Sequence, residues 1–476
     1  MKNLKSIDVS GSIASAKEHL ASDSSLSHST KSLMNLLIVI IELLMSRFGA
    51  NSKNSSVPPS QDPNGEKKKR VSSGRKPGGQ LGRKGTTLTQ VENPDEIVDV
   101  KIDPTLLPKG RKFKELYPEK RQVFDIKMSV HVTEYRIQVL KDDRDCVYKA
   151  KCIFAGPVQY GPSVRGLVCY LSNFQMVPVE RITDFFEHQL DLPLSAGTVV
   201  NINTEAAEAL VGFEALVKKE LISETVLHAD ETGINIAGKS AWLHGATSPS
   251  WSFFQASNKR GNEAMDTIGI IPNFNGVLVH DHWASYFKYE CIHAMCCAHL
   301  VRELTRIVEE SGHLWASSMI AHLYTMKKEV ESAPQRKLSG DRVAALTSRF
   351  DEIIGTGDIE SPLAKEIAAP KRRRKKQSRS RNLLDRLREK KSATLRFMTH
   401  GDAPFTNNQA ERDIRMTKVH QKISGCYKTL ETANASCLIR SFISTCQKQG
   451  ICVSSALNDL FQGKLPTFKL SSSPIP

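Results

Sequence analysis

The chain has 476 residues, with 66 Lys and Arg against 51 Asp and Glu, which gives a formal net charge of +15. Hydrophobic residues make up 40% of the sequence, enough for packed cores, so a wholly disordered chain is excluded. The length allows about two to four domains of ordinary size. The positive surplus indicates a polyanionic partner, either nucleic acid or an acidic membrane surface.

The positive surplus is confined to two segments. Gly65 to Gly85 contains eight basic residues and one acid, and Lys371 to Lys391 contains twelve basic residues and two acids. The remaining sequence is close to neutral, with 46 basic and 48 acidic residues. We expect both segments to contact this polyanionic partner through their charge. The candidate contacts are Lys67, Lys68, Lys69, Arg70, Arg75, Lys76, Arg83 and Lys84 in the first segment, and Lys371, Arg372, Arg373, Arg374, Lys375 and Lys376 in the second.

Neither a secretory signal nor a membrane anchor is expected near the N-terminus. Met1 to Ser10 has no apolar stretch. The apolar run from Leu33 to Met45 has thirteen residues and contains Asn35 and Glu42, so it is too short and too polar to cross a bilayer. The ten cysteines are scattered, and we expect them to be reduced thiols. These features favour a cytoplasmic protein, associated with the nucleoid in a prokaryote.

The first predicted element is a helix. Leu33, Leu37, Ile40 and Leu44 share one helical face, which is typical either of a short coiled-coil seam or of an amphipathic helix that packs on its own protein. The segment that follows, Asn51 to Gly85, is rich in Ser, Asn, Pro and Gly and lacks apolar periodicity. We expect it to be flexible without its partner.

Strands and then helices are predicted next. Apolar residues alternate from Arg121 to Leu140, which predicts two strands or one strand bent by a bulge. Pro178 to Ala209 predicts two helices separated by a short break, with Ser195 as the N-cap of the second. This pair could be a helix-turn-helix that contacts DNA, but two packed core helices are the favoured interpretation.

A mixed α/β pattern begins at Ser223. The sequence predicts short strands at Val226–His228, Ile234–Ile236 (after a turn at Gly233), Ala241–Ala246, Trp251–Ala256 and Val277–Val279. The last of these is wholly apolar, as expected of a strand buried on both faces. Helices are predicted from Ala298 to Glu310, onward to about Ala369, from near Asn408, and in a C-terminal region broken at Gly450.

Three acidic residues stand at the ends of these elements. Asp230 closes the first strand, Asp281 closes the buried strand 51 residues later, and Glu411 opens the late helix. Ligands gather at the carboxyl ends of strands in α/β sheets, and carboxylate oxygens suit Mg²⁺ or Mn²⁺, so the trio is a candidate two-metal site for phosphoryl transfer. The alternatives are structural: Asp230 as a turn former before Gly233, Asp281 as an ordinary strand-end acid, and Glu411 as a capping partner of Asn408.

A second cluster contains five soft or borderline metal ligands: Cys291, His293, Cys296, Cys297 and His299. Such residues could suggest zinc. The spacing matches no familiar finger, however, and two adjacent cysteines at a strand-to-helix junction suit chelation poorly. Buried thiols and a histidine at the start of a helix are the favoured interpretation.

Longer strings around these residues form a recognisable series. They run from the N-terminal region to the late helix: Asn51–Ser60, Arg75–Gly85, His228–Gly233, Gly276–Trp283, Ala298–Leu304, Arg381–Leu387 and Pro404–Arg415. In this order they resemble the transposases of the insertion-sequence sixty-six family, which belongs to the DDE transposases. The resemblance covers nearly the whole chain.

The resemblance implies an α/β fold with an RNase H-like mixed-sheet catalytic core. A helical insertion would separate the second and third acids, and N-terminal helical and small β-rich modules would precede the core. It implies that Asp230, Asp281 and Glu411 are the catalytic acids and the ligands of two Mg²⁺ (or Mn²⁺) ions, with zinc unlikely.

The expected domains are 1–50 (helical, oligomerisation), 51–90 (flexible basic linker), 91–160 (small β-rich module), 161–220 (helical, DNA-binding in one interpretation), 221–311 with 392–425 (catalytic core), 312–391 (helical insertion) and 426–476 (C-terminal helices).

One feature departs from the family pattern. Family members commonly carry a small zinc-binding module, with two cysteine pairs, before the catalytic core. Here Lys109 to Tyr117 contains no cysteine, and Cys146 and Cys152 are not spaced Cys-x-x-Cys. We therefore expect this module to keep its strands and to lack zinc, because four sulfur ligands are not available.

The resulting prediction is a DNA transposase that cleaves the ends of an insertion sequence and joins the 3′-hydroxyl ends to target DNA. Its expected partners are double-stranded DNA, further copies of itself and accessory proteins of the same element. Arg412, Arg415 and Lys418 follow Glu411 at helical spacing and are candidates for contacts to the DNA backbone, with ordinary helix surface as the alternative. Two other functions stay open: a catalytically inactive, transposase-derived DNA-binding protein, and a metal-dependent nuclease with the same core.

Overall fold

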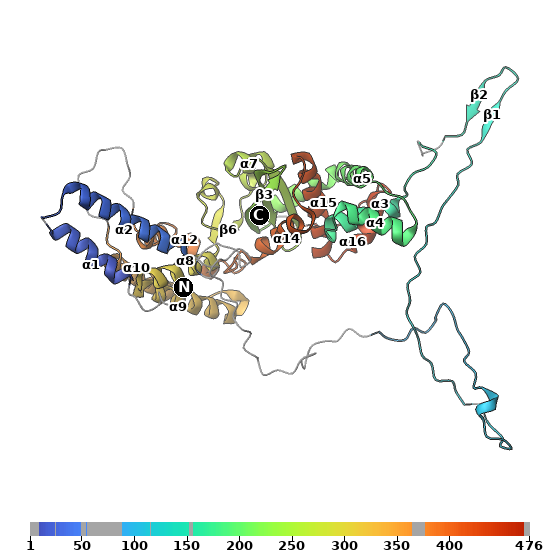
Figure 1. Cartoon of the computed structure of the whole chain (residues 1–476), viewed down its shortest axis with the longest axis horizontal. Helices are drawn as coiled ribbons and strands as arrows, with labels where there is room; N and C mark the ends of the chain where they lie inside the picture. Colours follow the sequence, from blue (N-terminus) through green and yellow to red (C-terminus); the bar gives the residue numbers. More distant parts are fainter. Residues whose placement is uncertain are drawn as a thin grey trace. The chain divides into compact units, whose positions relative to one another are not determined.

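The structure is a computed structural model that describes residues 9–23, 25–48, 54, 88–114, 116–151, 156–363 and 377–470 (Figure 1). Residue contacts divide the chain into two units, Glu66–Tyr135 and the remainder. The described part of the first unit contains a 3-10 turn, η3 (Pro104–Leu106), and no strand.

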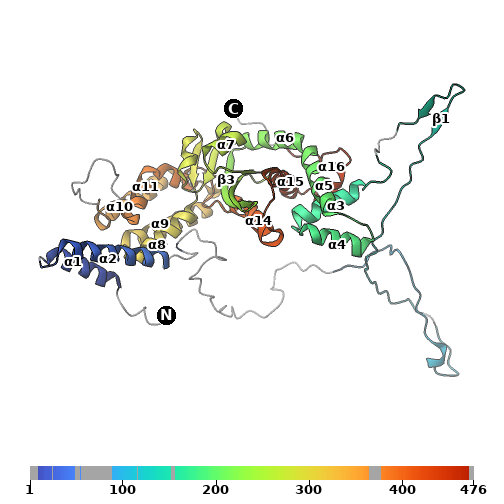
Figure 2. The same ribbon diagram turned by 45° about the horizontal axis from the view of Figure 1, so that its top comes forward.

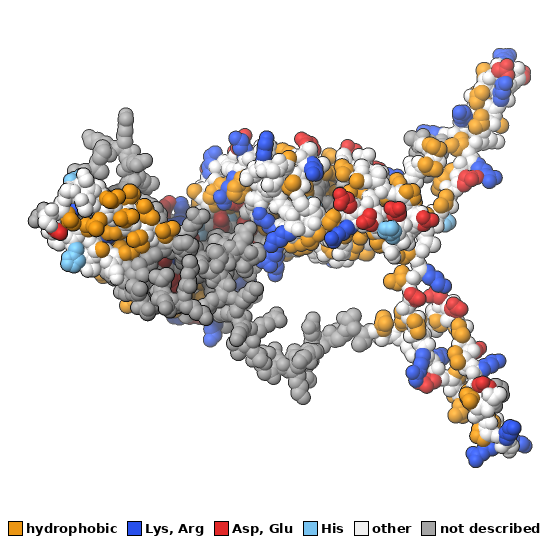
Figure 3. Space-filling model, viewed as in Figure 1, with side chains coloured by type: hydrophobic (Ala, Val, Ile, Leu, Met, Phe, Trp, Pro, Cys, Tyr) orange, Lys and Arg blue, Asp and Glu red, His pale blue; other side chains and the backbone are white. Residues whose placement is uncertain are grey.

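The N-terminal residues form two helices, α1 (Val9–Ser22) and α2 (His28–Phe48). Leu33, Leu37, Ile40 and Leu44 lie on α2 as predicted, and they are 42–59% exposed. Figure 3 shows hydrophobic side chains gathered over these helices. The interpretation in which this face packs on its own protein is therefore wrong for these four side chains. No helix in the described parts of the chain has the length and apolar character needed to span a bilayer.

The alternating segment before residue 140 forms less sheet than predicted. A short hairpin pairs β1 (Val139–Lys141) with β2 (Val147–Lys149), but 121–138 forms no strand. Ile126 and Val132 are 82% and 83% exposed, so the alternating apolar face has no core to cover. The strand prediction over 121–138 is wrong, because alternation yields a strand only where a partner supplies hydrogen bonds and a buried face.

Four helices precede the central sheet: α3 (Pro162–Cys169), α4 (Val179–Leu190), α5 (Ala196–Ala209) and α6 (Val211–Ile222). A π-helical turn, η4 (Tyr170–Phe174), follows α3 directly. The predicted break lies between α4 and α5, and the Ser195 hydroxyl caps α5 by accepting from the Thr198 N–H at 3.1 Å. Phe186 of α4 and Val199 of α5 are fully buried in the largest core, which confirms the prediction of packed core helices.

The described strands of the α/β region form a mixed sheet in the order β5-β4-β3-β6-β7. β3 (Val226–Ile236), β4 (Lys239–Thr247) and β5 (Ser252–Ser257) are antiparallel, whereas β6 (Val277–His280) and β7 (Ile292–Met295) continue in parallel from β3. β3 is longer than predicted: Gly233 pairs with Trp242 inside the ladder, so the expected turn there is wrong. The chain turns at Ala237 and Gly238, whose φ values of 48° and 81° suit a tight hairpin.

Helices cover both faces of this sheet (Figure 1, Figure 2). Leu227 and Ala229 of β3 belong to the core shared with α6 and with α7 (Asn262–Ile268). Ile234 and Ile236 of β3 belong to a core shared with α14 (Asn408–Ser424) and α15 (Leu430–Lys448). Alternate residues of one strand thus face different helices, as the two-residue repeat of a β-strand requires.

The outer edge of β5 is closed by side chains of α15. The backbone N–H groups of Ser252, Phe254 and Ala256 donate at 3.2, 2.9 and 2.8 Å. Their acceptors are Thr445, Ser441 and Asn434, which share one face of the helix. A covered edge strand cannot pair with another chain, so the sheet ends here. Past Gly450 the chain forms the last described helix, α16 (Val453–Leu460).

The segment between β7 and α14 includes the insertion predicted over 312–391, and its described residues are mainly helical. It contains α8 (Cys297–Ser311), α9 (Leu314–Ser332), α10 (Gly340–Glu360), α11 (Arg379–Glu389), α12 (Lys391–Thr394) and α13 (Arg396–Thr399). Trp315, Phe350 and Leu384 lie in its own core, separate from the cores of the sheet. One 3-10 turn, η7 (Pro334–Arg336), lies between α9 and α10, whereas η5 (Ile271–Asn273) and η6 (Ala284–Lys288) lie on either side of β6 in the sheet region.

The described part of the second basic segment is engaged in ion pairs inside this insertion. Arg381 and Arg388 both contact Asp358, at 2.7 and 2.6 Å, and Lys391 contacts Asp351 at 2.5 Å. Arg379 likewise contacts Glu310 at 2.6 Å. The DNA contacts expected of this segment therefore fall on its first six basic residues, Lys371 to Lys376, which lie outside the described residues.

Candidate active site

The pairing of two parallel strands brings the two predicted aspartates level with each other. β3 pairs with β6 through Val226 with Val277 and His228 with Val279, a constant offset of 51 residues. Asp230 and Asp281 have the same offset, so they continue this register two residues further. Paired residues of parallel strands point to the same face, and adjacent strands lie about 4.8 Å apart. The negative charge of Asp281 also raises the pKa of Asp230, so the two carboxylates lie close enough to interact.

The helix α14 brings the third acid to the same place. Glu411 lies in its first turn, and the helix packs on β3 and β4 through Ile414. Gly245 of β4 is paired with Asp230, and a Cβ at this glycine would lie 3.3 Å from Phe254 and 3.5 Å from Ile414. The missing side chain lets α14 approach the sheet opposite the aspartate.

Asn407 holds the start of α14 against β3. Its side-chain nitrogen donates to the Ala229 carbonyl at 2.7 Å, and its side-chain oxygen lies 2.8 Å from Nδ1 of His228. Asn407 is the residue before the helix, and no side chain caps the helix N-terminus. The alternative in which Glu411 takes part in a capping arrangement is therefore wrong.

The acids form a site of uncompensated negative charge. Burial raises the pKa of Asp230 well above its usual range, and the negative charges of Glu231, Asp281 and Glu411 raise it further. The neighbouring histidines do not offset this charge, because burial lowers the pKa of His280 to about 3 and that of His282 to about 2. The site is thus acidic and lacks a matching cation among these neighbours.

A further acid, Glu231, was not predicted. Its side chain is 1% exposed and accepts from the Tyr286 hydroxyl at 2.6 Å and from Arg260 at 2.7 Å. The Arg260 guanidinium lies between two indole rings, 4.6 Å from the centre of Trp242 and 4.4 Å from that of Trp283. Glu231 is therefore already paired with a cation, whereas Asp230, beside it in the strand, forms no ion pair within the described residues. The doublet Asp230-Glu231 was the available signal in the sequence.

The donor set fits a hard divalent cation. Glu411 Oε1 is buried and has no hydrogen-bond partner among the described residues. One oxygen of Asp230 accepts the Glu231 N–H at 2.9 Å, and one oxygen of Asp281 accepts the Trp283 N–H at 2.9 Å. These bonds fix the orientation of both carboxylates. Oriented carboxylate oxygens with unbalanced charge are the ligands that Mg²⁺ and Mn²⁺ prefer.

Comparison with known proteins identifies the family. The family described as "Transposase IS66 family" matches residues 157–435, which is more than half of the chain. The chain belongs to the IS66 family of transposases. The matched region includes the whole sheet, the insertion and α14. No curated protein matches the chain.

Membership of the IS66 transposase family confirms the resemblance found in the sequence and makes DNA the expected partner. The mixed α/β fold is also confirmed. The first basic segment, Gly65 to Gly85, precedes the region matched to the family. Its eight candidate DNA contacts, from Lys67 to Lys84, lie outside the described residues, so the structure does not place them.

The basic residues of α14 in this IS66 transposase differ from one another. Arg412 and Arg415 are exposed, and neither forms an ion pair within the described parts of the chain. Lys418 instead donates to the backbone carbonyl of Gly233, which ties α14 to β3. Arg412 and Arg415 therefore remain candidate DNA contacts, whereas Lys418 has a structural partner.

Proposed function

We propose that this chain is a DDE transposase with an RNase H-like core that cleaves the ends of an insertion sequence and joins them to target DNA. The observation that carries the proposal is the convergence of Asp230, Asp281 and Glu411, from two adjacent strands and one docked helix, at a site of unbalanced negative charge. Family membership supports the coarser part of the proposal, a DNA transposase.

Asp230, Asp281 and Glu411 would hold two Mg²⁺ ions between them. Bound Mg²⁺ would lower the pKa of an attacking hydroxyl and stabilise the leaving oxygen in phosphoryl transfer. The three carboxylates come from separate elements, so they can surround a phosphate placed at the mouth of the site. Asn407 keeps Glu411 in position by fixing the start of α14 to β3.

The reaction would run in two displacements at phosphorus. In the first, water attacks the scissile phosphate at the element's end, and the bond to the 3′ oxygen breaks to leave a 3′-hydroxyl. In the second, that hydroxyl attacks a phosphate in target DNA, so a new phosphodiester forms as the target strand is cut. Neither displacement needs a covalent bond between protein and DNA.

DNA would be held mainly by its phosphates. The two basic segments would supply positive charge, and Arg412 and Arg415 lie one and four residues after Glu411 on an exposed helix surface. Such contacts position the duplex and carry no sequence information. They also bring a polyanion to an acidic site, which metal must first neutralise.

Two element ends must be held together before joining, so we also propose that the transposase acts as an oligomer. The exposed face of α2, with Leu37 and Leu44 half exposed, is the candidate contact. Substituting both by Asp should reduce the molar mass measured by light scattering. An unchanged mass would assign oligomer formation to another surface.

The proposal is tested with a labelled DNA end, a supercoiled target and Mg²⁺. We take the DNA that flanks the gene as the substrate, because the protein should protect its terminal repeats in a footprint. A transposase yields a cut end and then a joined product. Cleavage without joining would indicate a nuclease, and binding without cleavage would indicate an inactive DNA-binding protein.

A further inference from the structure

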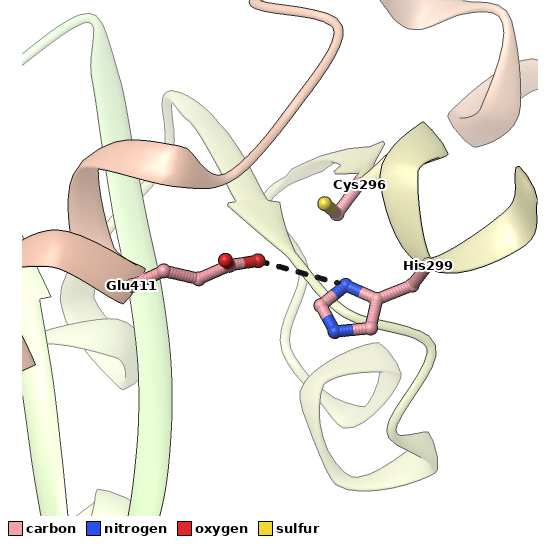
Figure 4. Close-up of side chains that lie close together, drawn as sticks. All are labelled: Cys296, His299 and Glu411. Carbon is pink, nitrogen blue, oxygen red and sulfur yellow. Dashed lines mark ion pairs between the residues drawn. The ribbon is translucent and has the colours of Figure 1, made fainter. Parts of the chain in front are cut away.

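A second set of metal ligands meets beside the carboxylate site. Cys296 directly precedes α8, His299 lies in the first turn of that helix, and Glu411 lies in the first turn of α14. One ligand atom from each of the three residues lies within 4.8 Å of the other two. Figure 4 shows the Glu411 carboxylate pointing toward the His299 ring, with the Cys296 sulfur beside them.

The three ligand atoms lie somewhat further apart than a bound metal ion would hold them. A tetrahedral zinc ion bound by sulfur, nitrogen and oxygen holds its ligand atoms about 3.4–3.6 Å apart. Nδ1 of His299 lies 3.9 Å from Oε1 of Glu411. Small side-chain rotations therefore suffice to close the set around an ion.

Two of the three ligand atoms lack a hydrogen-bond partner although they are buried. Within the described residues, neither His299 Nδ1 nor Glu411 Oε1 has one. Buried polar atoms without a partner are rare in folded proteins, and each one calls for a ligand. A bound cation would satisfy both atoms at once.

The backbone prepares Cys296 to act as a ligand. The Asn407 N–H donates to its sulfur at 3.2 Å. The side chain is fully buried, and the residue stands at the N-terminus of α8, where the helix dipole favours negative charge. Burial nevertheless raises the pKa of this thiol, so a metal ion would displace its proton on binding.

We propose that Cys296, His299 and Glu411 form a binding site for a soft or borderline divalent cation of the zinc class. Thiolate and imidazole ligands select such ions over Mg²⁺, which prefers oxygen. Three protein ligands leave a fourth position for water. Binding releases the thiol proton and occupies Glu411. This consequence rests on the proposed function: if Glu411 serves strand transfer, zinc bound to Glu411 competes with that use and inhibits strand transfer.

Cobalt(II) tests the binding site by spectroscopy, independently of activity. The full chain is titrated with Co²⁺ after four of the other nine thiols are removed by Cys146→Ser, Cys152→Ser, Cys426→Ser and Cys452→Ser. We expect visible bands typical of tetrahedral Co²⁺ together with a sulfur-to-cobalt charge-transfer band in the near ultraviolet, and we expect Zn²⁺ to displace both.

Two variants and one matched control decide the assignment. Cys296→Ser should abolish the charge-transfer band, and His299→Ala should weaken Co²⁺ binding at least about 100-fold, because loss of a mere supporting residue already costs about 10–100-fold. Cys297→Ser is the control, since this buried sulfur donates to the carbonyls of Met295 and Thr394, each at 3.7 Å, and is not one of the three ligands that meet. Absence of the band in the parent protein, or its retention in Cys296→Ser, would overturn the proposal.

Inhibition is measured separately, as the Zn²⁺ concentration that halves strand transfer in excess Mg²⁺. The rate of each variant is normalised to its own rate without zinc. On this scale Cys296→Ser should raise the half-inhibitory Zn²⁺ concentration at least about tenfold above that of the parent protein, and Cys297→Ser should leave it unchanged. A protein that shows the cobalt spectrum but no strand transfer in Mg²⁺ alone would contradict the proposed function and leave the metal site standing. Strand transfer without the cobalt spectrum would contradict the metal site alone.

Discussion

Asn407 and His228 are joined by a 2.8 Å hydrogen bond that ties the start of α14 to the strand β3. The amide nitrogen of Asn407 donates to the Ala229 carbonyl, so its oxygen accepts and Nδ1 of His228 donates. Burial lowers the pKa of His228, which keeps the ring neutral. One asparagine thus fixes the distance between the element that carries Glu411 and the strand that carries Asp230.

Asn407→Ala should therefore separate positioning from DNA binding. It leaves His228 and the Ala229 carbonyl buried without a partner, which costs about 1–3 kcal/mol of stability. Because Asn407 supports a metal-binding residue, cleavage should fall about 10–100-fold, and the Mg²⁺ concentration for half-maximal rate should rise. Asn408→Ala, at the neighbouring exposed position, is the control. A normal Mg²⁺ dependence in Asn407→Ala would contradict the positioning role.

Asp230→Asn should stabilise the metal-free protein while it inactivates the enzyme. The folded state raises the pKa of Asp230 above its ordinary value of 3.8, so the folded state binds this proton more tightly than the unfolded state does. The stability that this proton contributes is present below the unfolded pKa and is lost as the pH rises through the folded pKa. At pH 7 the buried acid therefore costs stability, because this pH lies above its unfolded pKa.

The measurement is thermal unfolding at pH 7 with and without Mg²⁺. Without Mg²⁺ we expect a higher midpoint for Asp230→Asn than for the parent protein, and with Mg²⁺ we expect only the parent to gain stability. The difference between the two proteins should shrink as the pH falls toward 4. A lower midpoint for Asp230→Asn without metal would show that the carboxylate is satisfied in the folded state.

Arg260 should matter chiefly because it neutralises Glu231. Arg260→Ala leaves a nearly buried carboxylate without its cation, and since the guanidinium is 40% exposed we expect a loss of about 1–3 kcal/mol. Adding Glu231→Gln removes the unpaired charge and should restore part of that stability. Denaturant unfolding of the two single variants and the double variant gives the coupling energy. Strictly additive effects would contradict a direct ion pair.

Salt dependence should identify which basic residues hold DNA. If the six basic residues from Lys371 to Lys376 contact duplex phosphates, they should add about 5 to the steepness of a plot of the logarithm of DNA affinity against the logarithm of salt concentration. Replacing all six by Gln should flatten the slope by that amount. Arg388→Gln is the matched control, because Arg388 is paired with Asp358 at 2.6 Å. Equal slopes for the six-residue variant and the parent would place the DNA contacts elsewhere.

The sequence patterns correctly predicted elements whose own residues carry a clear apolar or capping pattern. The apolar strand Val277–Val279, the two core helices around Ser195 and the late helix at Asn408 all form as expected. The turn predicted at Gly233 was wrong because pairing with β4 carries the strand through it to Ile236. The strands predicted over 121–138 were wrong because an alternating pattern specifies a face but supplies no partner.

The acidic residues of the site could be predicted from the sequence, but the residues that position and pair with them could not. Asp230 and Asp281 stand out because each follows a strand-like run, and their shared offset becomes meaningful only with the register of β3 and β6. Asn407 and Arg260 act through partners 179 and 29 residues away, and no local pattern encodes such distances. The Cys296–His299 pair was visible, but its third ligand, Glu411, comes from another helix.

The most direct test of the central claim is strand transfer by three single variants, Asp230→Asn, Asp281→Asn and Glu411→Gln, in Mg²⁺. Each removes one carboxylate charge with little change in shape, and the loss of several kcal/mol of transition-state stabilisation should reduce cleavage and joining at least about 1,000-fold. Binding of the labelled DNA end, measured in the same samples, should be retained. Cleavage at the parental rate by Asp281→Asn would contradict the assignment of the three acids.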